Sequence, residues 1–367
     1  MQNNNKKIIV SVNDFLVGGA QKLIVDQLSY FKNAGYEVSL ITLMDFPNRA
    51  NLYKSVPAGV KIYRINLKSS YDIFGWFRLL KVLKSDRPDV IFSHLFLSNM
   101  MVRVLSLFIP LRIFIVEHNT YKTKSKRYIW LDKILAKKAE KIITVSDEVR
   151  EFNILQHGIS AQKYITIRNG INLDVIENFK NTFSKEKTRS EKNIPPDTKV
   201  FLSVARLTPQ KNLSLLIESF IEFHKINTDS ILFMLGDGGE YEKLENLIAS
   251  HEARPYIKLV GNVDDVYSYC RSADFLISTS YIEGLSIAFL ESLAFGVPII
   301  ATKTGGTGVL IKDRVNGFLI SDFKKEAVIA TMQEAISFDY KSLSREAVNV
   351  SKGFSIQETN KKYEQLI

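Results

Sequence analysis

The chain has 367 residues, of which 46% are hydrophobic and 24% are charged; this length exceeds what one hydrophobic core usually supports, so two globular domains are expected. The single cysteine, Cys270, excludes an intramolecular disulfide and a cysteine-rich metal site, which favours a reducing cytoplasm. We find no signal-peptide core and no run of about 18 apolar residues, so we expect neither export nor a membrane-spanning helix.

The formal net charge of +10 is concentrated in the first half of the chain. Residues 1–185 contain 28 Lys and Arg against 15 Asp and Glu, whereas the remainder contains 21 against 24. Eight cations, which we call the basic window, lie close together: Lys122, Lys124, Lys126, Arg127, Lys133, Lys137, Lys138 and Lys141. An anionic membrane, an acidic substrate, nucleic acid or a solvated helix face would each explain such a run.

The first half alternates short apolar segments with longer segments of helical periodicity. Strands are predicted at residues 8–13, 37–43, 60–65, 89–92, 113–117, 141–145 and 164–167. Between the first two strands, apolar side chains recur at helical spacing from Leu23 to Phe31, and Gly35 then ends the helix. This alternation predicts parallel strands joined by right-handed crossovers.

A polar segment, residues 178–197, ends in Pro195-Pro196 and is interpreted as a linker. The pattern then starts again, with strands at residues 200–204, 231–235, 256–260, 274–278, 298–301 and 318–320, and a last helix at 356–366. We therefore predict an α/β fold of two Rossmann-like, doubly wound parallel-sheet domains that face a cleft, residues 1–180 and 195–350. A C-terminal helix within 351–367 could pack on either domain, including back on the first. Ligands of such folds lie beyond the carboxyl ends of the strands.

Two glutamates give the most specific chemical signal. Glu283 follows the strand at 274–278 in a loop, and Glu291 lies inside the helix predicted at 286–295. Ionised carboxylates are strong acceptors for the vicinal hydroxyls of a ribose or a hexose. The helix start between them offers backbone amides that suit a phosphate or a sugar oxygen, those of Leu285, Ser286 and Ile287.

Arg206 and Lys211 occupy the segment between the strand at 200–204 and the helix that begins near Leu213. Two cations there would hold a diphosphate and neutralise the charge that develops on a leaving nucleotide. A structural ion pair at the helix start is the alternative interpretation.

Four of the five histidines are scattered without metal-binding spacing and are given no role: His94, His157, His224 and His251.

Together these segments resemble the large family of retaining GT-B glycosyltransferases with a Glu-x7-Glu element, the glycosyltransferase family 4-like enzymes of bacterial polysaccharide and glycolipid synthesis. In the second half, the resemblance follows an ordered set of motifs: Arg206 and Lys211, Gly236-Asp237-Gly238, Glu283 with Glu291, Gly305-Gly306, and Asn316-Gly317. In the first half it rests on shorter motifs at strand ends: Gly18-Gly19-Ala20, Glu117-His118-Asn119, Ser146, and Asn169-Gly170-Ile171.

The resemblance implies a GT-B enzyme that transfers a sugar, with retention, from a nucleotide-diphosphate sugar to a saccharide or a lipid-linked acceptor. UDP is the favoured nucleotide, by family frequency. Arg206 and Lys211 would hold the diphosphate, and the amides from Leu285 to Ile287 would face the sugar and phosphate. Glu291 would bind the ribose, and Glu283 a hydroxyl of the transferred sugar.

The resemblance also assigns roles in the first domain. Gly18 and Gly19 would let the backbone approach the donor phosphates, since glycine has no side chain. His118 would line the acceptor side near the sugar. In such enzymes the leaving phosphate takes the acceptor proton, so no enzymic base, no metal and no further cofactor are expected.

Two other functions stay open: a nucleotide-sugar 2-epimerase on the same fold, and a non-catalytic nucleotide-sugar-binding partner subunit. Nucleic acid is not an expected partner, because no nucleic-acid-binding motif is recognisable. Tyr128 and Trp130 stand among the cations of the basic window, from Lys122 to Lys141, and these residue types suit the headgroup layer of a membrane. We expect a cytoplasmic protein that meets the anionic inner face of the cell membrane through this window.

Overall fold

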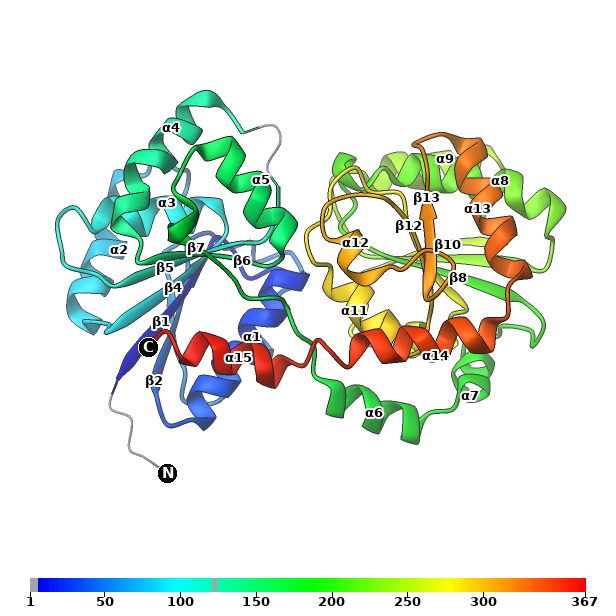
Figure 1. The fold of residues 1–367 in the computed structure, drawn as a ribbon, viewed down its shortest axis with the longest axis horizontal. Coiled ribbons are helices and arrows are strands. Elements are labelled where there is room, and N and C mark those ends of the chain that lie inside the picture. The colour runs from blue at the N-terminus through cyan, green and yellow to red at the C-terminus, as the bar shows by residue number, and fades with distance from the viewer. Residues whose placement is uncertain (1–5, 121–123) are drawn as a thin grey trace. The chain divides into compact units, whose positions relative to one another are not determined.

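The computed structural model describes residues 6–120 and 124–367 (Figure 1). The chain divides into two compact units: unit 1 comprises the described residues up to Asn169 together with Ile356–Ile367, and unit 2 comprises Gly170–Ser355. Each unit is a parallel sheet with helices on both faces, so the prediction of two Rossmann-like domains is confirmed. Two such domains make up the GT-B fold.

Unit 1 has a seven-stranded sheet in the order β3-β2-β1-β4-β5-β6-β7. Its strands are β1 (Lys7–Val12), β2 (Glu37–Thr42), β3 (Lys61–Arg64), β4 (Val90–His94), β5 (Ile113–Glu117), β6 (Lys141–Thr144) and β7 (Tyr164–Thr166). Its helices are α1 (Gly19–Asn33), α2 (Ile73–Asp86), α3 (Phe96–Leu105), α4 (Lys126–Leu135), α5 (Asp147–His157) and α15 (Ile356–Glu364), with short 3-10 helices η1 (Tyr53–Ser55), η2 (Ala136–Lys138) and η3 (Ala161–Lys163). The predicted strands differ from these bounds by one or two residues at their ends.

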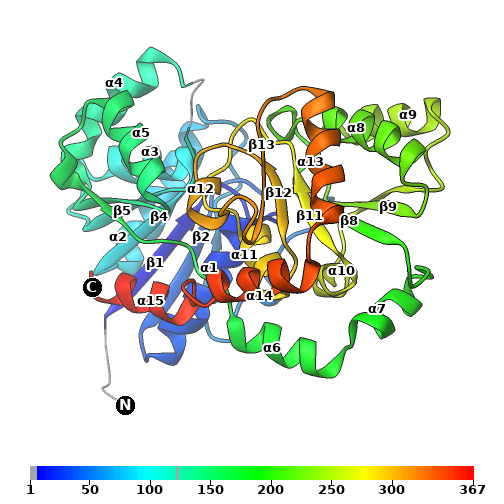
Figure 2. The ribbon, with the colours of Figure 1, turned by 45° about the vertical axis from the view of Figure 1, so that its right-hand side comes forward.

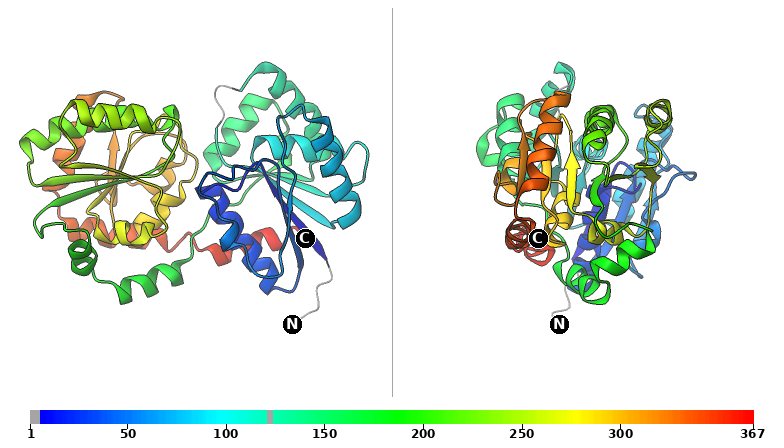
Figure 3. Two further views of the ribbon diagram at one scale, coloured as in Figure 1. Left: turned by 180° about the vertical axis from the view of Figure 1, so that it is seen from behind. Right: turned by 90° about the vertical axis from the view of Figure 1, so that its right-hand side faces the viewer.

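Successive residues of β1 belong to two different cores, because neighbouring side chains of a strand point to opposite faces. Ile9 packs with Leu79 and Leu83 of α2 and with side chains of α3, whereas Ile8 and Val10 pack with α1. The C-terminal helix α15 joins the second core: Tyr363 meets Phe92 edge-on at 5.3 Å, and Figure 3 shows α15 beside α1. Because helices cover both faces of the sheet, the side chains on both faces of β4 and β5 are buried along the whole length of these strands.

Unit 2 has a six-stranded sheet in the order β10-β9-β8-β11-β12-β13. Its strands are β8 (Lys199–Val204), β9 (Ser230–Leu235), β10 (Ile257–Gly261), β11 (Phe275–Ser278), β12 (Ile299–Thr302) and β13 (Gly317–Ile320). Its helices are α6 (Leu173–Thr182), α7 (Lys185–Glu191), α8 (Leu213–Ile226), α9 (Tyr241–Ser250), α10 (Val266–Ser272), α11 (Ile287–Ala294), α12 (Thr307–Leu310), α13 (Lys325–Ser337) and α14 (Tyr340–Ser351), with the 3-10 helix η4 (Pro209–Lys211). Helices α8, α9 and α13 share one core with the sheet, as Figure 2 illustrates.

The interpretation of residues 178–197 as a linker is wrong, because this segment contains the end of α6 and all of α7. Ser184 caps α7 by accepting a hydrogen bond from the amide of Lys187 at 3.1 Å. Two cations of α7 then bind Asp274 beside β11: Lys185 Nζ and Arg189 Nη2 each lie 2.7 Å from one carboxylate oxygen. Polar composition therefore marks the surface of a packed helix here.

Candidate functional site

The strand order of each sheet reverses beside its first strand, which places a ligand-binding position at the carboxyl ends of two strand pairs. In unit 1 these are β1 and β4, and in unit 2 they are β8 and β11. The predicted donor-binding residues of unit 2 follow β8 and β11 directly. Chain topology therefore brings together two loops that are about seventy residues apart in the sequence.

Hydrogen bonds join these two loops of unit 2 through their backbones. The amide of Tyr281 donates to the carbonyl of Gln210 at 2.9 Å, and the side-chain amide of Gln210 donates to the carbonyl of Ile282 at 2.9 Å. Thr279 Oγ1 donates to the carbonyl of Asn212, also at 2.9 Å. The loops are thus fixed in place relative to each other before any ligand binds.

Lys211 and Glu283, which sequence reasoning treated as separate ligand contacts, form a direct ion pair. Nζ of Lys211 donates to Oε1 of Glu283 at 2.6 Å, and their side chains are 19% and 9% exposed. Ser280 Oγ donates to the same carboxylate oxygen at 2.7 Å. The charge of Lys211 is therefore balanced within the protein, and a bound diphosphate would share this cation with Glu283.

Arg206 lies two residues beyond β8 and is exposed to solvent. Its loop is packed against the loop after β9, since the amide of Leu207 donates to the carbonyl of Asp237 at 3.0 Å. This approach needs glycines: a Cβ atom on Gly236 would lie 1.9 Å from the carbonyl oxygen of Ala205, and one on Gly238 would lie 2.3 Å from that of Leu207. The Gly-Asp-Gly motif therefore shapes the loop that carries Arg206.

Helix α11 begins at Ile287, one residue later than predicted, with Ser286 at the N-cap position. The Ser286 side chain makes no capping hydrogen bond to any described residue, which leaves its hydroxyl available to a ligand. Leu285 and Ile287 are buried on either side of it. The preceding turn is closely packed, because a Cβ on Gly306 would lie 2.1 Å from the carbonyl oxygen of Gly284.

Glu291 lies within α11 and is 4% exposed. Tyr267 of α10 donates to its Oε1 atom at 3.3 Å. The tyrosine ring packs edge-on against Phe295 at 5.3 Å and Phe179 at 5.8 Å, which fixes its position. No sequence signal singled out Tyr267, because a tyrosine on a helix fits an ordinary packing role.

In unit 1, Gly18 and Gly19 lie at the start of α1, the helix that follows β1. The loop before them is fixed by Asp14, whose Oδ1 atom accepts hydrogen bonds from the amide of Leu16 at 3.2 Å and from Nε2 of Gln21 at 3.1 Å. Gln21 is buried on the inner side of this helix, and the hydrogen bond to Asp14 satisfies its side-chain amide there. The prediction that the two glycines approach donor phosphates stays a prediction.

His118 follows β5 directly, and the structure brings it to His94 at the end of the neighbouring strand β4. Nδ1 of His94 lies 3.0 Å from Nε2 of His118, with the two rings stacked. Burial lowers the pKa of His118 to about 4 and lowers that of His94 well below its ordinary value, so both imidazoles are neutral near pH 7. In the sequence, His94 could have been recognised as a candidate site residue because it is a polar residue at the carboxyl end of an apolar strand.

Ser146 has a structural role in this structure. Its hydroxyl caps α5 by accepting from the amide of Val149 at 3.2 Å. Asp147 and Glu148 occupy the first turn of the helix, where carboxylates complement the helix dipole, and Gly158 ends it in the left-handed conformation.

The basic window does not form one uniform exposed surface. Lys122 lies outside the described residues. Lys124 is not a surface cation: its side chain is 5% exposed and it pairs with Asp132, which also binds Arg103 Nη2 at 2.5 Å. Lys141 donates to the carbonyl of Gln162 at 2.8 Å. The exposed members are those of α4 and η2: Lys126, Arg127, Lys133, Lys137 and Lys138.

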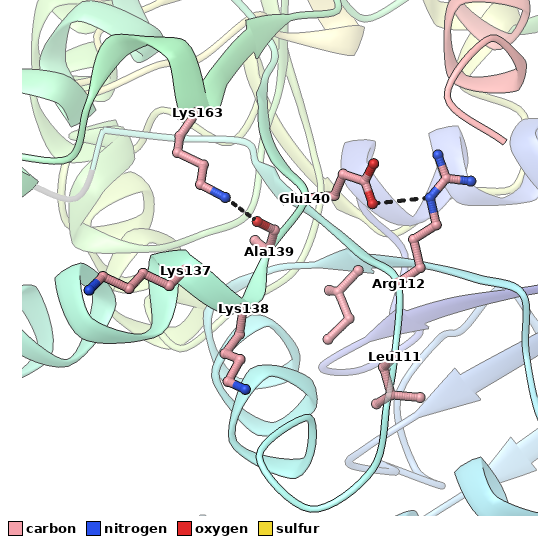
Figure 4. Close-up of a pocket in the computed structure, with 8 residues that line it drawn as sticks. Leu111, Arg112, Lys137, Lys138, Ala139, Glu140 and Lys163 are labelled. Atoms are coloured by element: carbon pink, nitrogen blue, oxygen red, sulfur yellow. Dashed lines mark hydrogen bonds and ion pairs between the residues drawn. The ribbon is translucent and has the colours of Figure 1, made fainter.

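A cavity of about 350 Å³ borders this surface at Lys137 and Lys138 of η2 (Figure 4). Its lining includes Lys137, Lys138, Arg112 and Glu140, with Arg112 Nε donating to Glu140 at 3.1 Å. Because the lining residues precede or begin β5 and β6, the cavity lies at the amino edge of the sheet. His118 and Gly18 belong to the opposite edge, so this cavity is separate from the candidate site of unit 1.

Two family models match the chain in succession: Glycosyltransferase Family 4 over residues 17–175, and Glycosyl transferases group 1 over residues 184–349. The chain is 24% identical over 358 residues to the UDP-Gal:alpha-D-GlcNAc-diphosphoundecaprenol alpha-1,3-galactosyltransferase of Escherichia coli, across 93% of this chain and 91% of that protein. It is 27% identical to the amylovoran biosynthesis glycosyltransferase AmsD of Erwinia amylovora, across 87% of each chain. The structure of Anabaena HepE in complex with UDP and glucose superposes with a TM-score of 0.84 at 17% identity, over 98% of this chain and 99% of that one.

The fold and these matches define an enzyme of the glycosyltransferase class. The chain is a glycosyltransferase of the GT-B, family 4 type. None of the helices formed by residues 6–120 and 124–367 has the length and the hydrophobicity that a membrane-spanning helix requires.

Proposed function

We propose that the enzyme transfers a sugar, with retention of anomeric configuration, from a UDP-sugar to a saccharide or lipid-linked acceptor in cell-surface polysaccharide or glycolipid synthesis. The observation that carries this proposal is the paired Lys211 and Glu283 at the strand reversal of unit 2, beside the uncapped start of α11. A cation, a carboxylate and helix-start amides in one place match the diphosphate and the hydroxyls of a nucleotide-sugar. The names of relatives that use UDP-sugars, or were solved with UDP, support UDP.

In the proposed reaction, the diphosphate is held by Arg206, Lys211 and the amides from Leu285 to Ile287. As the bond between the anomeric carbon and the phosphate oxygen breaks, these groups stabilise the negative charge on the leaving nucleotide. Glu291 accepts hydrogen bonds from the ribose, and Glu283 accepts one from the transferred sugar. The leaving phosphate oxygen takes the proton of the acceptor hydroxyl, and the oxygen of that hydroxyl bonds to the anomeric carbon.

Unit 1 supplies the acceptor side of the proposed reaction. Gly18 and Gly19 admit the donor phosphates to the start of α1, and His118 lines the acceptor site as a neutral hydrogen-bonding group. No side chain is required as a base. We propose that neither a metal ion nor another cofactor takes part.

A lipid-linked acceptor would place the enzyme at the cytoplasmic face of a membrane. The name of the Escherichia coli relative specifies a diphosphoundecaprenol acceptor, which supports this acceptor class. The exposed cations of α4 and η2 flank Trp130, 65% exposed, and Ile134, 47% exposed, which together suit an anionic headgroup layer. We include peripheral contact through this part of the basic window in the proposal.

Thermal unfolding with UDP, GDP, ADP and TDP, each with and without EDTA, tests the proposal. UDP is expected to raise the Tm most, since a ligand at about 100 times its Kd stabilises the folded state by about 2.7 kcal/mol. EDTA should leave that shift unchanged. Incubation with UDP-sugar alone is the control, because a 2-epimerase would convert the sugar without any acceptor. A shift for none of the four nucleotides would overturn the proposed donor site.

A further inference from the structure

Helix α2 of unit 1 exposes large apolar side chains at its start. Tyr71, Ile73, Phe74 and Phe77 are 83%, 67%, 77% and 64% exposed, respectively. The helix is firmly placed, since its opposite side buries Leu79 and Leu83 in the core. Large exposed apolar side chains gathered in one segment mark a surface that binds a ligand or a partner.

The exposed side of α2 combines these apolar residues with cations and no carboxylate. At about 100° per residue, the exposed positions fall on one arc of the helix: Ile73, Phe74, Phe77, Arg78, Lys81, Lys84 and Ser85. The acidic residues at the two ends of α2, both of which the structure describes, are paired. Asp72, the N-cap, accepts from the amide of Gly75 at 3.0 Å and from Nη2 of Arg78 at 3.2 Å, which balances the charge of Arg78. Asp86 is buried and accepts from Ser39 Oγ at 3.0 Å, so the cations of this side that remain for a ligand are Lys81 and Lys84.

We propose that this face of α2, together with Tyr71, docks unit 1 on an anionic lipid surface. The aromatic side chains enter the interfacial layer, and Lys81 and Lys84 remain at the level of the lipid phosphates. A helix of apolar and aromatic residues flanked by lysines is typical of interfacial lipid binding. A protein partner fits less well, because lysine is depleted in the cores of protein interfaces.

The place of α2 in the fold connects the proposed docking to the acceptor. Helix α2 follows β3, so its start lies at the carboxyl edge of the sheet, the edge that also carries Gly18 and His118. A lipid-bound acceptor would thus arrive at the edge of unit 1 where acceptor binding is proposed. This connection rests on the proposed function, whereas the lipid contact itself does not.

Vesicle sedimentation of the full chain tests the docking, with phosphatidylcholine vesicles that contain or lack phosphatidylglycerol. We expect binding to the anionic vesicles, and at least a tenfold loss of binding in two double variants, Phe74→Ser with Phe77→Ser and Lys81→Glu with Lys84→Glu. Leu155→Ser is the matched control, because Leu155 is an apolar residue of α5 that is 85% exposed outside this face. Undiminished binding of the two α2 variants would overturn the inference.

Tryptophan reporters separate α2 from the basic window. Trp76 of α2 packs against the core of unit 1, and its Nε1 donates to the carbonyl of Ser70 at 3.0 Å, so it does not report on the exposed side. Phe77→Trp in a Trp76→Phe, Trp130→Phe background reports on the exposed side of α2, and Trp76→Phe alone leaves Trp130 of α4 as the reporter. Brominated lipids should quench the reporter of α2 on binding; quenching of Trp130 alone would overturn docking through α2. A patch that instead joins two copies of the chain would show as concentration-dependent dimers, lost in the Phe74→Ser, Phe77→Ser variant, without vesicle binding.

The donor site provides an independent readout. The α2 variants should keep the same Tm and the same UDP-induced Tm shift as the unsubstituted chain. Loss of vesicle binding with this shift retained separates docking from catalysis. If UDP stabilises neither the unsubstituted chain nor the variants, this result counts against the proposed function. The vesicle result then stands by itself.

Discussion

At the scale of single residues, Lys211 and Glu283 serve each other as well as a ligand. Both side chains are largely removed from water, so each is costly to leave without its partner. Ser280 adds a hydrogen bond to the same oxygen of Glu283. We therefore expect the pair to stabilise the fold even without a bound donor. We also expect it to contribute to turnover, which a measurement of stability does not report.

A double-mutant cycle separates these two contributions. Lys211→Met and Glu283→Gln should each lower the unfolding free energy by about 1–3 kcal/mol, because the remaining partner is left buried and unpaired. The double variant should recover part of that stability but none of the turnover, which we expect to fall by about 10²–10³-fold in each variant. Urea unfolding and initial rates measure the two quantities.

An exposed pair in the same unit gives the control for this cycle. Lys225 and Glu222 lie 2.9 Å apart in α8, with side chains 63% and 39% exposed. Lys225→Met and Glu222→Gln should change neither stability nor turnover appreciably, since exposed pairs contribute little. Full turnover in Lys211→Met would remove this residue from the donor site and leave only the structural ion pair.

At the scale of elements, the donor site depends on loops that approach one another through glycine. Gly306 stands where the loop after β12 meets the turn that carries Gly284, and the space there admits no side chain. The strand ends fix the distance between these loops, so a clash cannot be relieved without moving Glu283 or the start of α11. Backbone spacing, and not only side-chain chemistry, therefore sets the geometry of the site.

Gly306→Ala should weaken UDP binding by at least tenfold, because the added Cβ would force the carbonyl of Gly284 away from its position. Isothermal titration with UDP measures this loss. Gly308→Ala is the matched control two residues further on, where an added Cβ has no described atom within 4 Å. Equal UDP affinity in both variants would show that the loop around Gly284 takes no part in donor binding.

At the scale of the whole molecule, unit 1 concentrates buried histidines. Burial lowers the pKa of His118 and of His157 to about 4, and lowers that of His94 well below its ordinary value. The unfolded chain takes up these protons near the ordinary value of 6.5, before the folded chain does. Stability is therefore complete above about pH 6.5 and is lost as the pH falls toward about 4.

The Tm should accordingly fall between about pH 7 and about pH 5, before most carboxylates titrate. His118 alone corresponds to about 3 kcal/mol over its full shift. Glu117, whose pKa burial raises, acts in the opposite sense, but one carboxyl does not offset three imidazoles. Thermal unfolding at both pH values measures the effect.

His118→Gln should reduce this pH dependence, while His251→Gln, at an exposed position of unit 2, should leave it unchanged. The glutamine keeps a hydrogen-bonding group beside His94 without a titrating imidazole. A Tm that is independent of pH over this range in the unsubstituted chain would contradict the burial of these histidines.

Local patterns in the sequence determined the strands, most of the helices and the chemical types at the site. Apolar strands, helical periodicity and helix-ending glycines depend on neighbours a few residues away, so they can be recognised in the sequence alone. For the same reason Arg206, Lys211 and Glu283 were recognised between strands and helix starts, and Glu291 inside the helix that follows. Polar composition led to the wrong interpretation of residues 178–197 as a linker. Tertiary packing decides the structure there, because the cations of α7 bind Asp274, which is far away in the sequence.

Only the tertiary structure decided which of these residues meet. Strand order places the loops after β8 and β11 side by side and so pairs Lys211 with Glu283, and it places β4 beside β5 and so pairs His94 with His118. The same packing buries Lys124 against Asp132 and leaves the start of α2 uncovered. A sequence read along the chain does not contain these outcomes in any local pattern, because contact and burial depend on elements that are distant in sequence and adjacent in the fold.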